Sequence, residues 1–121
     1  IPFEKVLSVH GHAWFLQWID PSFYARHIKQ IWKFFPKEQV MVMVQDDLWT
    51  NQEEFLQNFL EFLGVKADFP SSLFGVDINH DPDDVWDYLN LEVREELIEV
   101  YRSDILQLSE ILERDLSYWL T

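Results

Sequence analysis

The chain lacks cysteine entirely, so disulfide bonds and thiolate metal sites are excluded. Basic residues are scarce: nine Lys and Arg stand against 22 Asp and Glu, which gives a net charge of −13. A charge of this sign and size argues against nucleic acid or an anionic membrane surface as a partner, and against a self-contained site for a polyanionic cofactor. No apolar run approaches the roughly 20 residues that a membrane-spanning helix requires.

Apolar material is nevertheless plentiful. Apolar residues make up 48 % of the chain and aromatic residues 17 %, including six Trp and ten Phe. This is enough for the core of one small domain, with some aromatics left over for a surface that another segment fills. We therefore predict a single, incomplete domain over residues 1–121. Because the sequence starts at Ile1 rather than Met, we also expect that it was trimmed or excised from something longer.

The first clear helical pattern follows residues 1–19, which we interpret as an irregular or helical lead-in. Asp20 is placed to cap a helix, with Pro21 at the first helical position, where its missing N–H costs nothing. Apolar residues then recur at helical spacing as far as Phe35. Pro36 ends this pattern, because proline disfavours helix before and at its own position.

A continuous apolar run, Val40–Val44, comes next and ends at the acid pair Asp46 and Asp47. Strands that are covered on both faces, as in a parallel sheet, have this pattern. A buried helical segment would give it too, but the run is short and Pro36 bounds it. We therefore predict a parallel-sheet strand over about residues 39–45 and an α/β fold class that is mostly helical in this chain. The alternative is a mostly helical domain with an internal apolar segment.

Two further helical segments follow. Thr50 and Glu53 form a capping box for a helix that ends before Gly64, which stands where a C′ glycine is expected. Residues 65–89 are predicted to be a long loop. Helical periodicity returns from Asn90, and because Ser103 can act as a cap, we expect a kink or break near Arg102–Asp104.

The order and wording of these segments resemble sulfotransferases that use 3′-phosphoadenosine 5′-phosphosulfate, in particular bacterial-type and carbohydrate sulfotransferases. In that family a Y-A-x-x-L helix leads into F-P-x-E-Q-V, then E-D-L, then a helix that ends F-L-G-L. The family's closing Y-R-x-D and R-D-L-S-x-W-L also have counterparts here. The matching residues that we interpret as structural are Tyr24, Pro36, Glu38, Gln39, Asp46, Asp47, Leu48, Gly64, Tyr101, Arg114, Asp115 and Trp119.

The resemblance implies the C-terminal portion of a P-loop-like fold, with Asp46 and Asp47 at the carboxyl end of a strand, where open α/β sheets bind ligands. We favour a structural role for the acid pair, because a carboxylate beside a bound phosphosulfate would be repelled. The implied activity is transfer of a sulfuryl group from 3′-phosphoadenosine 5′-phosphosulfate to a hydroxyl or amine. The implied compartment is the cytoplasm for a bacterial member and the Golgi lumen for a eukaryotic carbohydrate sulfotransferase.

Several family elements have no counterpart in the sequence. The glycine-rich loop that cradles the phosphosulfate is absent, since the three glycines are Gly11, Gly64 and Gly75. The general base is absent too, so we name no catalytic and no cofactor-binding residue, and we do not expect this chain alone to bind the cofactor. The implied partner is the missing N-terminal half of the fold or a partner chain, and self-association is a further expectation. Glu113 departs from the family, which has Gly before the final R-D.

Three other groups of residues have two interpretations each. Trp14, Phe15 and Trp18 suit the wall of an acceptor pocket, although such a cluster is more often core. His10 and His12 could hold a metal, but too few ligands lie near them in the sequence, and we predict no metal site. The acidic segment 77–84 lacks the spacing of a calcium loop. The alternative function for the whole chain is a truncated, non-catalytic, acidic helical interaction module.

Overall fold

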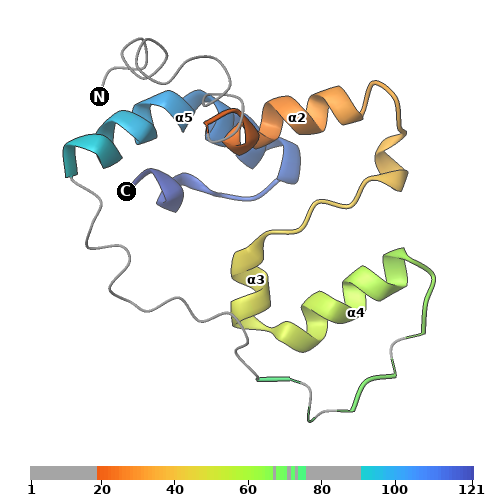
Figure 1. The fold of residues 1–121 in the computed structure, drawn as a ribbon. Coiled ribbons are helices and arrows are strands. Elements are labelled where there is room, and N and C mark those ends of the chain that lie inside the picture. Colours follow the sequence, from red (N-terminus) through yellow and green to blue (C-terminus); the bar gives the residue numbers. More distant parts are fainter. Residues whose placement is uncertain (1–18, 67, 71, 73, 76–90) are drawn as a thin grey trace. The chain divides into compact units, whose positions relative to one another are not determined.

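The computed structural model describes residues 19–66, 68–70, 72, 74–75 and 91–121. They belong to two compact units: unit 1 is drawn from residues 1–35 and 83–121, and unit 2 from residues 36–82. The described elements, shown in Figure 1, are η2 (Asp20–Ser22), α2 (Tyr24–Ile31), η3 (Lys37–Gln39), α3 (Gln45–Thr50), α4 (Gln52–Phe62), α5 (Leu91–Leu112) and η6 (Ser117–Leu120). The prediction of a mostly helical chain is thus confirmed for the described part.

Unit 1 is built on α5, which packs against α2 and against η6, where the closing segment has run back alongside the helix. Its buried apolar residues come from all of these regions: Ala25 and Ile28 of α2, Leu108 of α5, and Leu116 before η6. Ala25 and Leu116 are fully inaccessible to solvent. Because Ala25 is small, the backbone of α2 can approach α5 closely, and Ile28, one turn later, lies on the same buried face.

Helix α2 is shorter than the sequence pattern predicted. Pro21 stands at the start of a helix as expected, but that helix is the short η2, and α2 begins only at Tyr24. After Ile31 the chain tightens, since the N–H of Phe34 bonds to the carbonyl of Ile31, three residues back. Phe34 and Phe35 then lie 80 % and 54 % exposed, which is too exposed for an apolar helix face in a core.

Helix α5 runs without interruption for 22 residues, so the predicted break near Arg102–Asp104 is wrong. Ser103 does not cap a new helix. Instead, its hydroxyl and its carbonyl both accept hydrogen bonds from the side-chain amide of Gln107, one turn later, at 3.3 and 3.2 Å. A serine whose hydroxyl is bonded within the helix offers the backbone no alternative conformation, so the helix continues.

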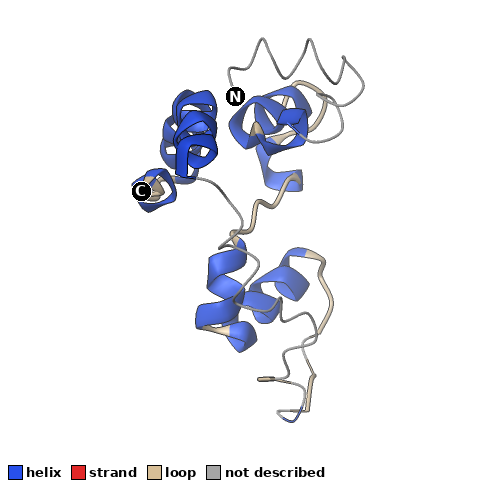
Figure 2. Cartoon of the chain, turned by 60° about the vertical axis from the view of Figure 1, so that its left-hand side comes forward, coloured by secondary structure: helices blue, strands red, loops and turns tan. Residues whose placement is uncertain are grey.

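The predicted strand over residues 39–45 is also not present, and no strand occurs in the part of the chain that the structure describes (Figure 2). Lys37–Gln39 forms η3, and α3 already begins at Gln45. Between them the backbone is extended, with φ and ψ of −122° and 106° at Val40 and −97° and 124° at Val44. A strand requires a paired neighbour as well as extended backbone, and no described segment pairs with this one.

Helix α4 is capped at both ends by residues that adjoin it in the sequence. The N-cap is Asn51, not the predicted Thr50: the side-chain oxygen of Asn51 accepts the N–H of Glu54 at 3.2 Å. The hydroxyl of Thr50 turns back to the carbonyl of Asp46 within α3. At the other end, Gly64 has φ +69° and the N–H of Val65 reaches the carbonyl of Leu60 at 2.9 Å. This is a Schellman motif, which confirms Gly64 as the C′ residue.

Candidate functional site

The acid pair lies in the first turn of α3, directly after the extended segment. The N–H of Asp47 bonds to the carbonyl of Val44 at 3.0 Å, and the carbonyl of Asp47 accepts the N–H of Asn51 at 2.9 Å. Carboxylates are favourable in the first turn of a helix, where unpaired N–H groups carry partial positive charge. The pair is therefore placed where it stabilises the turn from extended backbone into helix.

A concavity of about 360 Å³ opens between the extended segment and the two helices of unit 2. Met41–Met43 form one wall, and Phe55 lies beside them. The polar lining is made of side chains that accept hydrogen bonds: Asp47, Thr50, Asn51, Glu54 and Asn58. This lining can accept hydrogen bonds from hydroxyl or ammonium groups.

The same lining does not suit a phosphosulfate. Its described residues include the carboxylates of Asp47 and Glu54 but no Lys, Arg or His. An anionic group placed there would meet like charge without a cation or a glycine-rich turn to compensate. The described residues of unit 2 therefore do not fit the sulfuryl donor that the sequence resemblance implies.

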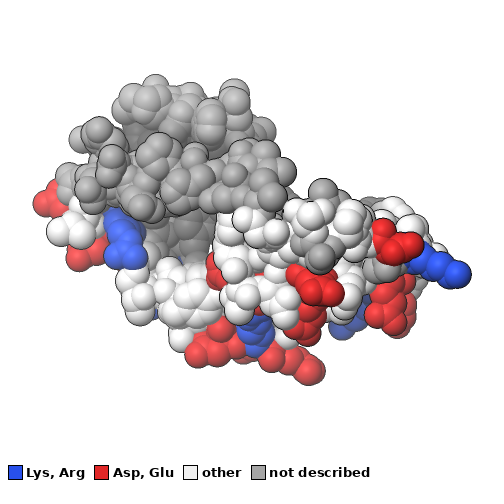
Figure 3. Space-filling model, turned by 90° about the horizontal axis from the view of Figure 1, so that it is seen from below, with Lys and Arg blue, Asp and Glu red and all other residues white. Residues whose placement is uncertain are grey.

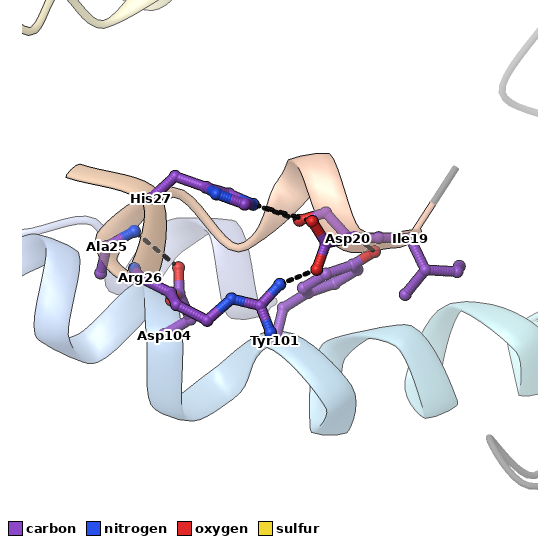
Figure 4. Close-up of polar contacts among 7 residues, drawn as sticks. All are labelled: Ile19, Asp20, Ala25, Arg26, His27, Tyr101 and Asp104. Atoms are coloured by element: carbon purple, nitrogen blue, oxygen red, sulfur yellow. Dashed lines mark hydrogen bonds and ion pairs between the residues drawn. The ribbon is translucent and has the colours of Figure 1, made fainter. Parts of the chain in front are cut away.

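In unit 1 the most constrained polar group is the carboxylate of Asp104, which is only 7 % exposed (Figure 4). Its two oxygens accept the backbone N–H groups of Ala25 at 2.9 Å and of Arg26 at 3.0 Å. These are N–H groups of the first turn of α2, whose own N-cap residue, Phe23, provides no side-chain cap. Asp104 therefore caps α2 from another helix, 79 residues away in sequence.

Tyr101, one turn before Asp104 on α5, holds the segment that precedes α2. Its hydroxyl donates to the carbonyl of Ile19 at 3.0 Å, and its ring packs on that of Phe23 with centroids 4.9 Å apart. Burial raises the pKa of the Tyr101 phenol above its usual value, while a hydrogen bond with Ser22 acts in the opposite direction. The phenol is therefore a neutral donor at physiological pH.

The third polar group around α2 is Asp20 in η2, which the sequence pattern had placed as the cap of this helix. Its carboxylate pairs with the guanidinium of Arg26 and lies 3.2 Å from Nε2 of His27. The guanidinium of Arg26 also stacks 4.5 Å above the ring of Phe23. Asp20 thus binds the side chains of α2, while Asp104 binds its backbone.

The closing segment, after α5, turns the chain back onto that helix. Glu113 has φ +50°, and the N–H of Arg114 reaches the carbonyl of Ser109 at 3.0 Å, so α5 ends in a second Schellman motif with glutamate at C′. The N–H of the buried Leu116 then donates to the hydroxyl of Ser109 at 3.1 Å.

Asp115 fixes the start of η6, since its carboxylate accepts the N–H of Ser117 at 2.9 Å. Hydrogen bonds from Ser117, first from its side chain and then from its backbone, lower the pKa of the Asp115 carboxyl. Because the folded-state pKa is lowered, this contact adds stability at neutral pH and loses it as the pH falls through that pKa. Trp119 follows in η6, with its ring edge-on to Tyr118 at 6.2 Å.

The remaining predicted site residues are dispersed. Tyr24 is the first residue of α2, Pro36 precedes η3, Glu38 and Gln39 lie exposed within η3, and Leu48 lies in α3. The predicted acceptor contacts Trp14, Phe15 and Trp18 lie outside the described residues, as do His10, His12 and segment 77–84. The structure therefore places Asp47 of the acid pair in the lining of a concavity and leaves the aromatic cluster as a prediction.

Neither a metal-binding cluster nor a membrane-spanning helix occurs among the described residues. No group of three or more His, Asp or Glu is arranged there to hold a metal ion. None of the described helices combines the length and the apolar character needed to cross a membrane.

The comparison with known families identifies one match. The sulfotransferase domain matches residues 12–107, a range that includes the extended segment, the acid pair and the Asp104 cap, but not the closing residues from Glu113 onward. No curated protein and no solved structure matches the chain significantly. Since the matched range covers well over half of the sequence, the chain belongs to the sulfotransferase domain family.

Proposed function

We propose that these residues form the C-terminal part of a sulfotransferase of the bacterial or carbohydrate-directed type. The observation that carries this proposal is the family match over residues 12–107. The family implies 3′-phosphoadenosine 5′-phosphosulfate as the donor of a complete enzyme, and the acceptor is a hydroxyl or an amine. The donor's phosphosulfate loop and the general base are contributed by the N-terminal half of the fold or by a partner chain.

In this proposal the extended segment Val40–Val44 becomes a strand of a parallel sheet once it is paired. The backbone conformation at both ends of the segment supports this, since Val40 and Val44 already have φ and ψ angles in the β region. The two residues also bracket the wall of the concavity in unit 2. Pairing would add the backbone hydrogen bonds of a β-ladder, which this segment does not form with any described residue.

The concavity of unit 2 is the proposed wall of the acceptor site. Asp47 and Glu54 accept hydrogen bonds, and the chemistry of their carboxylates suits a hydroxyl or an ammonium group of the acceptor. Sulfuryl transfer requires the acceptor to be held in line with the donor, and positioning of this kind is a main source of rate enhancement. Trp14, Phe15 and Trp18 remain a separate proposal from the sequence, as an aromatic surface against which an acceptor ring stacks.

The first test is calorimetric titration of the 121-residue chain with 3′-phosphoadenosine 5′-phosphate, beside a circular dichroism melt. We expect a folded, helical chain with no saturable binding below about 1 mM, a dissociation constant equal to roughly −4 kcal/mol. The same titration on a chain that also includes the N-terminal half is expected to give binding in the micromolar range. Micromolar binding by the 121 residues alone would overturn the proposed division of the site.

An acidic interaction module without catalysis is the second candidate. Large apolar side chains that remain exposed favour it, above all Phe34 at 80 %, with Phe35 and Trp49 at 54 % each. Sedimentation velocity separates the two candidates. A chain that self-associates, and that stays inactive when it is extended by the N-terminal half, would support the module and exclude the enzyme.

A further inference from the structure

A groove of about 490 Å³ lies in unit 1 between α2 and α5. One side carries Arg26 and Lys29 of α2 together with Lys33, which lies in the turn just after that helix. Ser103 and Gln107 line the α5 side, and Val100 and Phe23 contribute apolar surface. The chain has nine Lys and Arg in all, so a third of its strong cations line this one groove.

The two lysines are held in place without being neutralised. The ammonium of Lys29 donates to the side-chain oxygen of Gln107 across the groove, and that of Lys33 donates to Gln30 at 2.9 Å. Both acceptors are uncharged amides, and neither ammonium forms an ion pair with any residue that the structure describes. Each lysine thus keeps its full charge and has one hydrogen bond to a neutral amide.

The other charged groups of the groove are engaged. Asp104 is the one carboxylate among the described lining residues, and both of its oxygens accept backbone N–H groups of α2. Arg26 pairs with Asp20 at one end of the groove. The part of the groove between Lys29 and Lys33 is therefore positive in a chain whose surface is mainly acidic. On the face seen in Figure 3, red acidic side chains are more numerous than blue basic ones.

We propose that this groove binds an extended acidic segment of a partner protein. Lys29 lies in the last turn of α2 and Lys33 in the tighter turn that follows it, so the rise between the two residues is roughly 6–7 Å. Alternate side chains of an extended peptide repeat every ~6.7 Å, so two glutamates with one residue between them match the two ammonium groups. The side-chain NH2 of Gln30 and the hydroxyl of Ser103 can bond to the backbone of the bound segment, whereas the Gln107 amide is already bonded to Lys29 and Ser103.

The groove lies wholly within unit 1. The binding proposed for it does not depend on the sulfuryl transfer proposed above. The test measures fluorescence anisotropy of a labelled peptide that alternates glutamate and serine, added to the full chain. The matched peptide alternates lysine and serine, and a second one carries the same number of glutamates in a row. A sulfated oligosaccharide and inorganic sulfate serve as competitors.

We expect saturable binding of the alternating acidic peptide and none of the basic one. The double variant Lys29→Gln with Lys33→Gln should weaken binding about tenfold, which corresponds to two partly exposed ion pairs. Lys66→Gln removes the same kind of charge from an exposed position in unit 2 and should leave the affinity within about twofold. Circular dichroism melts of all variants check that each remains folded.

Binding should also weaken when the ionic strength rises from about 0.05 M to about 0.5 M, because the contacts are charged and exposed. If Lys66→Gln weakened peptide binding as much as the double variant does, the proposal would be overturned in favour of a general attraction between charges. Absence of saturable binding, equal binding of the peptide with consecutive glutamates, or binding of the oligosaccharide in place of the peptide would overturn it as well.

Discussion

In unit 1 the bonds that begin α2 come from α5, through a carboxylate 79 residues away, whereas in unit 2 the bonds that begin and end α4 come from the residues beside it. Unit 1 also buries more apolar residues than the described part of unit 2. Unit 1 buries Ala25, Ile28, Leu108 and Leu116, while the buried apolar residue of the described part of unit 2 is Val44. A helix with local caps can form with little core, but it gains little stability from the rest of its unit.

Large exposed apolar side chains occur in both units, but in the described part of unit 2 only Val44 is buried beside them. Trp49, Phe59, Phe62 and Leu63 are all at least 40 % exposed on α3 and α4 or just after them. An amphipathic helix draws most of its stability from burying its apolar face. We infer that unit 2 is the less stable unit when the extended segment has no paired neighbour.

The largest expected effect comes from Asp104→Ala, which removes the cap of α2. Two N–H groups would lose their acceptor, and the loss should destabilise the protein by about 2–3 kcal/mol. Hydrogen exchange should show faster exchange of the Ala25 and Arg26 amides, with α4 amides unchanged. Glu110→Ala, at an exposed position on the same helix, is the control and should change the free energy of unfolding by less than about 0.5 kcal/mol. Faster exchange in α4 as well would contradict the separate stabilisation of the two units.

A smaller effect is expected from Asn51→Ala, which removes the local cap of α4. The expected cost is about 1 kcal/mol, and it should appear as faster exchange of the Glu54 amide and as lower helicity by circular dichroism. Asn58→Ala, within the same helix, should be neutral or slightly stabilising, because alanine has the higher helix propensity. If α2 amides also exchanged faster in Asn51→Ala, the two units would have to be treated as one cooperative structure.

The smallest effect is a gain in stability. Glu113 occupies a left-handed conformation that costs a residue with a Cβ about 1 kcal/mol, so Glu113→Gly should stabilise the end of α5 by about 0.5–1 kcal/mol in a urea melt. Glu110→Gly is the matched change three residues earlier, where the backbone is helical, and should destabilise by a similar amount. Destabilisation by both changes would show that the Glu113 side chain contributes more than its backbone conformation costs.

Features fixed by neighbouring residues were the ones that the sequence pattern predicted well. The helix that ends before Gly64 is an example, because the glycine that closes it stands at its end. The one-residue error at its start arose because Thr50 and Asn51 are both good N-cap residues, and the choice between them depends on the backbone of the preceding α3.

Features that depend on distant residues were predicted poorly. The strand over residues 39–45 needs a paired neighbour, which the pattern of one segment cannot provide. Asp104 was interpreted as part of a break in its own helix, although it caps another helix far away in the chain. The signal that could have revealed it is the absence of a capping side chain immediately before Tyr24, together with an aspartate placed among the apolar residues of α5.

Because Asp104 follows α2 by many residues in the sequence, the cap of α2 is synthesised well after the helix itself. A ribosome adds about 5–20 residues each second, so Asp104 is made roughly 4–16 s after Ala25. During that interval we expect α2 to fray and its apolar face to stay accessible, while α4, with its own caps, can already form. Proteolysis of ribosome-bound chains stalled before and after Asp104 would measure this. Equal protection of α2 in both chains would mean that nascent α2 is stabilised by something other than α5.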